Sequence, residues 1–198
     1  MAELDYEQVE TAFRLVNREI WIVTAADGRR RGGLTATWVS QASIDRQAPA
    51  VLVAIAPNHF TAELIDAGKA FAVHLLRRNQ SEIALIFALG SGRKRDKLAG
   101  ITITSAKTHS PILSDCLAYL DCRVFARLDA GDRVYYWADV LAGRVLWDEQ
   151  PLTERDLMAA AADEQQQQIA ASRDDDIQVQ HSLRQMWRQD MPEYLRLS

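Results

Sequence analysis

Residues Gly33–Ser43 read GLTATWVSQAS, and no other stretch says more about the fold of this chain. Apolar and polar side chains alternate from Gly33 to Ile44, which predicts a β-strand with one buried face. The expected buried face carries Leu34, Ala36, Trp38, Ala42 and Ile44, and the opposite face carries Thr35, Thr37, Gln41 and Ser43, with Ser40 beside them. This polar row is either a solvent-exposed strand face or a binding surface, and Gly32-Gly33 would allow another group to approach closely.

A second informative segment follows directly. The continuous apolar run Ala50–Ala56 predicts a strand buried on both faces. The segment Asn58–Thr61 (NHFT) then opens a short helix that continues to Ala67 and that Gly68 ends. Free amides and a small hydroxyl at a helix N-terminus form an anion site, and simple capping is the equal alternative. The basic run Gly92–Lys97 either completes a phosphate site or is a solvated loop, and taken alone it favours the loop.

The rest of the chain adds antiparallel strands and few helices. We expect strands at Glu19–Thr24, Ala70–Leu76, Leu117–Leu128 and Arg133–Val145, with tight turns at 27–28 and 129–132. A short amphipathic helix is expected from Asp5, and Asn79 with Glu82 resembles a capping box for another helix. This order indicates a mainly β protein, a barrel or sandwich with short helices. The chain contains neither GxGxxG nor GxxxxGK[ST], which excludes nucleotide binding through those motifs.

Length and composition narrow the class of protein. The 198 residues are 48% hydrophobic and carry a formal net charge of −4, which suits one folded domain with a helical appendage. No apolar run approaches the length of a membrane span and the N-terminus lacks a secretory pattern, so we expect a cytoplasmic protein without membrane contact. The mild acidity argues against a nucleic-acid partner.

The composition changes after Trp147, where an Ala- and Gln-rich tail begins. Thr153 is a plausible helix N-cap, and Asp174–Asp176 is expected to separate two helices. The second of these helices carries an apolar stripe of Ile177, Leu183, Met186 and Trp187. Such a stripe should cover a face of the barrel or of a partner subunit, which predicts a homodimer. We therefore divide the chain into a barrel domain (1–150) and a C-terminal helical extension (151–198).

The histidines offer little sign of a metal site. None stands in an i, i+4 pair and no HExxH is present, so we expect no bound metal. His74 lies inside an apolar strand, where a core histidine with satisfied hydrogen bonds is the simpler interpretation. His59 lies at a strand-to-helix junction, which favours a functional site somewhat more.

Taken in order, several segments resemble the flavin reductase-like family of the FMN-binding split barrel. The matching stretches are WIVTAADG, GGLTATWVSQASID, PAVLVAIAPNHFTAELIDAGKAFAVHLL, the helix ending in Phe87, RKRDKLAG and LDCRVFARLDAGDRVYYWADV, across residues 9–147. The GLTATWVSQAS and NHFTAELI segments are the specific part. The resemblance implies a split barrel that binds FMN at the interface of a homodimer, with FAD as a possible alternative.

The resemblance also implies which residues meet the flavin. The isoalloxazine ring would lie near Thr35, Ala36, Thr37 and Trp38, and the ribityl and phosphate end would follow Ser40, Gln41, Ala42 and Ser43. The phosphate would be held at the helix entrance formed by Asn58, His59, Phe60 and Thr61, with charge from Lys94 or Lys97. His74 and Leu75 match a strand position that borders the flavin.

The activity implied by the resemblance is NAD(P)H-dependent reduction of flavin, or direct reduction of a small organic substrate on tightly bound FMN. Arg133 stands where many such reductases have a histidine close to the nicotinamide pocket. An arginine there could grip a pyridine-nucleotide phosphate or an acidic partner instead. Trp38 is bulkier than the small polar residue expected at its position, and would stack on or shield the ring. Two alternatives stay open: a flavin-binding electron carrier without a pyridine-nucleotide site, and a barrel that has lost its cofactor.

Overall fold

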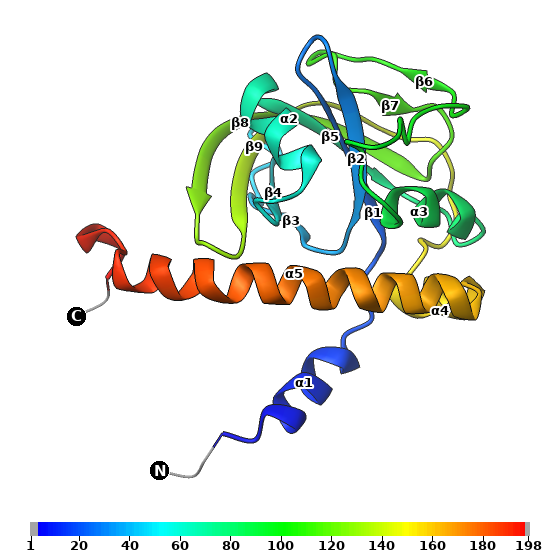
Figure 1. Ribbon diagram of the computed structural model, residues 1–198. Helices are drawn as coiled ribbons and strands as arrows, with labels where there is room; N and C mark the ends of the chain where they lie inside the picture. Colours follow the sequence, from blue (N-terminus) through cyan, green and yellow to red (C-terminus); the bar gives the residue numbers. More distant parts are fainter. Residues whose placement is uncertain (1–3, 197–198) are drawn as a thin grey trace.

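A computed structural model of the chain describes residues 4–196 and has one large antiparallel sheet at its centre (Figure 1). The seven strands of this sheet lie in the order β2-β1-β5-β8-β9-β4-β3. Their bounds are β1 Trp21–Ala26, β2 Arg31–Ala36, β3 Val39–Gln41, β4 Ala50–Ile55, β5 Ala70–Leu75, β8 Ala118–Asp129 and β9 Val134–Val145. A separate two-stranded sheet pairs β6, Ile103–Thr104, with β7, Ile112–Leu113. The sheet curls into a half-barrel, which confirms the prediction of a mainly β split barrel with short helices.

The described residues also form five α-helices. Their bounds are α1 Tyr6–Leu15, α2 Phe60–Gly68, α3 Ser81–Ala88, α4 Glu154–Ala160 and α5 Asp163–Gln189, and a short 3-10 turn follows at Glu193–Leu195. One core cluster packs α2 against the sheet through residues such as Leu64, Phe71 and Tyr136. A second cluster lies under α3 and α4 and includes Phe87 and Leu152. Leu152 follows the boundary expected at residue 151, so the first part of the tail packs into the core.

The strand expected from Gly33 to Ile44 is in fact two strands, which corrects the prediction of one continuous element. β2 pairs with β1, whereas β3 pairs with β4 at the opposite edge of the sheet. The chain crosses between the two edges at Thr37 and Trp38. Because the strand bends there, the alternation of buried and exposed side chains fails: Trp38 is 47% exposed and Ile44 is 95% exposed. This crossing shapes the site described below.

Two helix boundaries also differ from expectation. The capping box of Asn79 and Glu82 is wrong, because α3 begins at Ser81 and has Gln80 as its N-cap without a side-chain cap. The left-handed residue after α2 is Lys69, with φ of 54°, and Gly68 is the last helical residue. A Cβ on Gly68 would lie 2.2 Å from the carbonyl oxygen of Ala26, so packing against β1 explains the glycine there.

The C-terminal tail does form two helices, but they separate at residues 161–162 and not at Asp174–Asp176. Thr153 caps α4 as predicted, its hydroxyl accepting a hydrogen bond from the amide of Asp156 at 3.3 Å. α5 runs unbroken through the aspartates for 27 residues. An aspartate inside a helix costs only about 0.7 kcal/mol relative to alanine, which a long helix with tertiary contacts overcomes.

Helix α5 crosses one side of the barrel as a single rod, and α1 lies beyond it (Figure 1). Trp187 packs close to Gly131 in the β8–β9 turn, where a Cβ would meet the backbone oxygen of Leu183 at 2.6 Å. Ile177 and Met186, in contrast, stay more than half exposed. The tail therefore covers part of a barrel face and leaves part of its stripe uncovered. Within residues 4–196 no helix is both long and apolar enough to cross a membrane.

Candidate flavin site at the strand crossing

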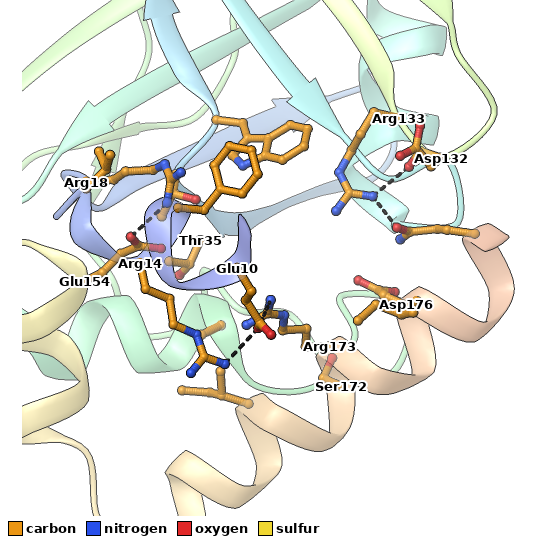
Figure 2. Close-up of a pocket in the computed structure, with 18 of the residues that line it drawn as sticks. Glu10, Arg14, Arg18, Thr35, Asp132, Arg133, Glu154, Ser172, Arg173 and Asp176 are labelled. Atoms are coloured by element: carbon orange, nitrogen blue, oxygen red, sulfur yellow. Dashed lines mark hydrogen bonds and ion pairs between the residues drawn. The ribbon is translucent and has the colours of Figure 1, made fainter. Parts of the chain in front are cut away.

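The crossing from β2 to β3 borders a small hollow that we call the cradle. Its volume is about 140 Å³, and it is lined by Leu34, Thr35, Ala36, Thr37, Trp38, Ala54, Ile55, Ala56, His59, Arg133 and Asp176. It adjoins a cleft of about 1260 Å³ between the barrel, α1, α4 and α5 (Figure 2). Thr35, Thr37, Trp38, Arg133 and Asp176 line both spaces, so these side chains stand at the boundary between them.

The floor of the cradle is made of small residues and backbone. Ala36, Ala54 and Ala56 are nearly buried, and their short side chains leave room above the strand ends. The hydroxyl of Thr35 donates to the carbonyl oxygen of Ala84 at 2.7 Å, which fixes this strand to α3. The hydroxyl of Thr37 makes no hydrogen bond within residues 4–196 and is available to a ligand. The cradle therefore offers an apolar floor with one free hydroxyl at its edge.

Arg133 and Trp38 form one wall. Arg133 directly precedes β9, and Figure 2 shows its side chain reaching from the barrel toward α5. Its guanidinium lies 5.0 Å from the centre of the Trp38 ring, within range of a cation–π interaction. Nη1 of Arg133 donates to the carbonyl oxygen of Asp132 at 2.6 Å and also to the side-chain oxygen of Gln180. A flat cationic and aromatic surface of this kind suits a planar or anionic ligand.

A second polar group forms where α2 begins. Nδ2 of Asn58 donates to Asp176 at 3.0 Å, and Nε2 of His59 lies 3.0 Å from the other carboxylate oxygen. Burial alone would raise the pKa of Asp176, but hydrogen bonds from His59 and Asn58 and the charges of His59 and Arg133 hold that pKa below its usual value. Asp176 is therefore ionised at neutral pH.

The sequence prediction missed both α5 residues at this site. Asp176 was expected to mark a helix boundary, and Gln180 carried no signal at all. Gln180 is 6% exposed, and its Nε2 has no hydrogen-bond partner within the described residues. The only local hint was the apolar stripe of the tail, which indicated that α5 packs on something but not where.

Several predicted site residues lie outside both spaces. Ser40, Gln41, Ala42 and Ser43 lie on β3 or just after it, largely exposed, and the Gln41 amide donates to the backbone oxygen of Ser43 at 2.7 Å. Phe60 and Thr61 are buried in the core side of α2, and Lys94 is exposed in its loop. After Trp38 the chain continues as the edge strand β3, so residues 40–43 do not reach the cradle, whereas Phe60 and Thr61 face the core.

His74, Leu75 and Lys97 are also away from the cradle. His74 is fully buried, its Nδ1 donating to the oxygen of Ile22 at 3.0 Å and its Nε2 accepting from the amide of Leu113 at 3.2 Å. Burial lowers the pKa of His74 to about 4, so it is a neutral core histidine. Nζ of Lys97 donates to the oxygen of Phe87 at 2.6 Å, and burial lowers its pKa to about 8. Both residues hold the core together, and neither supplies charge to the cradle.

Among residues 4–196 no group of three or more His, Cys, Asp or Glu side chains could hold a metal ion. The cradle instead combines an apolar floor, an aromatic ring, a guanidinium, an imidazole and a free hydroxyl. These groups suit an organic ligand with a flat ring and an anionic end.

The chain is similar in sequence to several known proteins. Diflavin flavoprotein A 1 of Synechocystis sp. is 33% identical over 142 residues, which are 69% of this chain and 24% of that protein. The high molecular weight rubredoxin of Moorella thermoacetica is 34% identical over 137 residues, 68% of this chain and 58% of that protein. The chain thus spans only part of each of these relatives.

Solved structures show the same fold. An NADH:FAD oxidoreductase of Streptomyces globisporus superposes with a TM-score of 0.67 at 21% identity, covering 77% of this chain and 92% of that one. Flavoredoxin from Methanosarcina acetivorans superposes with a TM-score of 0.61 at 20% identity, covering 65% and 69% of the two chains. The family model of the flavin reductase like domain matches residues 13–158. This chain therefore belongs to the flavin reductase-like family, and its fold is the flavin-binding half-barrel of that family.

Proposed function

We propose that this protein binds FMN in the cradle and reduces it with NAD(P)H. The observation that carries this proposal is the cradle itself: a floor of small residues beneath the paired Trp38 ring and Arg133 guanidinium. As a member of the flavin reductase-like family the chain is a flavin-binding oxidoreductase domain. The choice of FMN and of a nicotinamide donor, and a cytoplasmic location, are parts of the proposal.

The residues at the cradle fit a flavin. Ala36, Ala54 and Ala56 leave space for a flat ring, and the Thr37 hydroxyl can bond to one of its polar atoms. Asn58 and His59 already hold an anionic carboxylate, so they can hold a phosphate. The cradle volume of about 140 Å³ is below the several hundred Å³ of a usual ligand pocket, so the neighbouring cleft must contribute.

The flavin, when bound, supplies the redox chemistry, and the protein supplies position and electrostatics. Trp38 lies at the edge of the cradle and would keep bulk water from the ring. Arg133 places a positive charge where the cradle meets the large cleft, and this charge attracts the phosphates of a dinucleotide. Thr37 orients the ring through its hydroxyl. Each of these roles belongs to a side chain that lines both spaces.

The contacts that Arg133 already makes within the protein support a second possible function. Its guanidinium bonds to Gln180 and to the Asp132 carbonyl and stacks on Trp38, so docking of a dinucleotide has to compete with existing contacts. The relatives include a diflavin flavoprotein, a high molecular weight rubredoxin and, by fold, a flavoredoxin. The alternative proposal is therefore a flavin-binding electron carrier that exchanges electrons with another redox protein.

Anaerobic addition of NADH and then NADPH to the flavin-loaded protein separates the two functions. Bleaching of the flavin absorption supports the reductase. A flavin that stays oxidised with both nucleotides but is bleached by dithionite supports the carrier.

We expect Arg133→Ala to raise the nicotinamide KM about fivefold, on the order of 1 kcal/mol, and to leave kcat largely unchanged. The reason is that the guanidinium contributes attraction that is equal in the ground state and the transition state. Its effect should shrink as salt is added, because the Debye length is about 8 Å at physiological ionic strength. Arg123→Ala is the matched control, since Arg123 is exposed on β8 and lines neither space. An unchanged KM in Arg133→Ala would contradict this role.

We also propose a homodimer. α1 has no buried residue, and Tyr6, Phe13 and Leu15 are each more than 60% exposed. Exposed apolar side chains gathered on one short helix usually mark an interface. We expect sedimentation equilibrium to give twice the chain mass of 22.3 kDa at micromolar concentration. Phe13→Glu should shift the equilibrium toward monomer, whereas a monomer for the unmodified chain at every concentration would refute the dimer.

A further inference from the structure

Helix α5 places one carboxylate on the polar groups at the entrance of α2. Asp176 accepts from Asn58 at 3.0 Å and meets Nε2 of His59 at 3.0 Å. The residues that meet here are more than a hundred positions apart in the sequence, so this is not local helix capping. Asp176 also lies beyond residues 13–158, the part that the family model matches. The carboxylate of this contact thus comes from the part of the chain that the family match does not include.

The contact is selective within α5. Asp174 and Asp175 precede Asp176 directly, yet both are exposed and make no ion pair within the described residues. The Asp176 side chain is 22% exposed and points into the cleft from α5 (Figure 2). His59 is the N-cap of α2 but makes no side-chain cap of its own. Asn58 and His59 at the start of α2 therefore form an anion-binding site, which the Asp176 carboxylate occupies.

This anion-binding site adjoins the cradle. His59, Arg133 and Asp176 all line the cradle, and Asp176 with Arg133 also lines the large cleft. A ligand whose ring lies on the alanine floor and whose anionic end reaches Asn58 and His59 would meet the carboxylate of Asp176. Two anions cannot share these donors without strong repulsion in a partly buried site. Asp176 has to withdraw before a phosphate enters.

We propose that Asp176 is a specificity-determining residue that occupies the phosphate subsite of the flavin site. It disfavours a flavin phosphomonoester relative to the unphosphorylated flavin, and binding of the phosphate displaces it together with this part of α5. This inference rests on flavin binding in the cradle. It adds that the C-terminal helix, which the family match does not include, sets the charge of the ligand that the site accepts.

The test compares two ligands that differ only in the phosphate, FMN and riboflavin, by fluorescence titration of each protein. We expect Asp176→Asn to raise the preference for FMN over riboflavin at least tenfold, a change of about 1.4 kcal/mol. The affinity for riboflavin should change much less. Asp175→Asn is the matched control: it removes the same charge one residue earlier and should leave the FMN-to-riboflavin ratio as in the unmodified protein.

An unchanged ratio in Asp176→Asn, or a ratio that falls, overturns the inference even when both flavins bind. Failure of both ligands to bind any variant overturns flavin binding itself, so the two failures are distinguishable. Hydrogen exchange of the unmodified protein provides a second readout that needs no substitution. FMN should speed exchange across residues 170–180 and riboflavin should not, and equal exchange with both ligands overturns the displacement of α5.

Discussion

Replacing Thr37 by Trp is expected to weaken flavin binding at least 100-fold, which corresponds to about 2.8 kcal/mol. Thr37 lies at the strand crossing and lines both the cradle and the large cleft. The cradle has a volume of only about 140 Å³, so an indole in place of the threonine side chain fills the space in which the ring would lie. Titration of FMN and riboflavin by fluorescence measures the loss, and far-UV circular dichroism checks that the barrel is folded.

Ser40→Trp is the matched control for this substitution. Ser40 is exposed on β3, three residues further along the same segment, and lines neither space. An indole there should leave flavin affinity within a factor of a few. The opposite pattern, with binding lost in Ser40→Trp and kept in Thr37→Trp, would contradict flavin binding in the cradle. It would indicate instead that the flavin binds along Ser40–Ser43.

The second large effect concerns pH and the buried His74. Its pKa in the folded protein is about 4, compared with 6.5 for a free histidine, because burial disfavours the charged ring. Between these two values the unfolded chain binds a proton that the folded chain does not. Stability is therefore fully present above pH 6.5 and falls as the pH falls toward 4. The loss is about 2 kcal/mol at pH 5 and about 3 kcal/mol once both forms are protonated.

Urea unfolding at pH 7, 6 and 5 measures this dependence. His74→Gln should be less stable at pH 7, because the core contacts of the ring change, but its stability should vary much less with pH. His181→Gln is the control, since His181 is exposed on α5, and it should keep the full dependence. Equal slopes in the unmodified protein and in His74→Gln would show that another group carries the acid sensitivity.

The elements of the barrel could be predicted because their signals are local. The apolar run Ala50–Ala56 corresponds to β4, and the two long strands around the turn 129–132 correspond to β8 and β9. Periodicity and turn residues act over a few positions, so they can be read from the chain directly. The same local patterns failed at Gly33–Ile44, where the chain bends between two sheet edges. They failed again at Asp174–Asp176, because the low helix propensity of aspartate predicts a helix end there, whereas α5 continues through these residues.

Part of the site was equally predictable. The sequence indicated Thr35, Thr37, Trp38, His59 and Arg133, and the structure brings these residues together. Other candidate residues lie outside the cradle, and their contact with a flavin stays a prediction. Ser40, His74 and Lys97 are close to the site along the chain or by resemblance, but an exposed edge strand and two buried hydrogen bonds direct their side chains elsewhere.

By itself the sequence determined the mainly β class, the family resemblance and the polar segments at Thr35–Trp38 and Asn58–Thr61. Alternation, turn chemistry and motif order are all carried by neighbouring residues. Only the tertiary structure decided that β2 and β3 lie at opposite sheet edges and that Asp176 and Gln180 of α5 reach Asn58, His59 and Arg133. These contacts join residues that are tens to more than a hundred positions apart, and their geometry depends on the path of a long helix across the barrel, which no local pattern encodes.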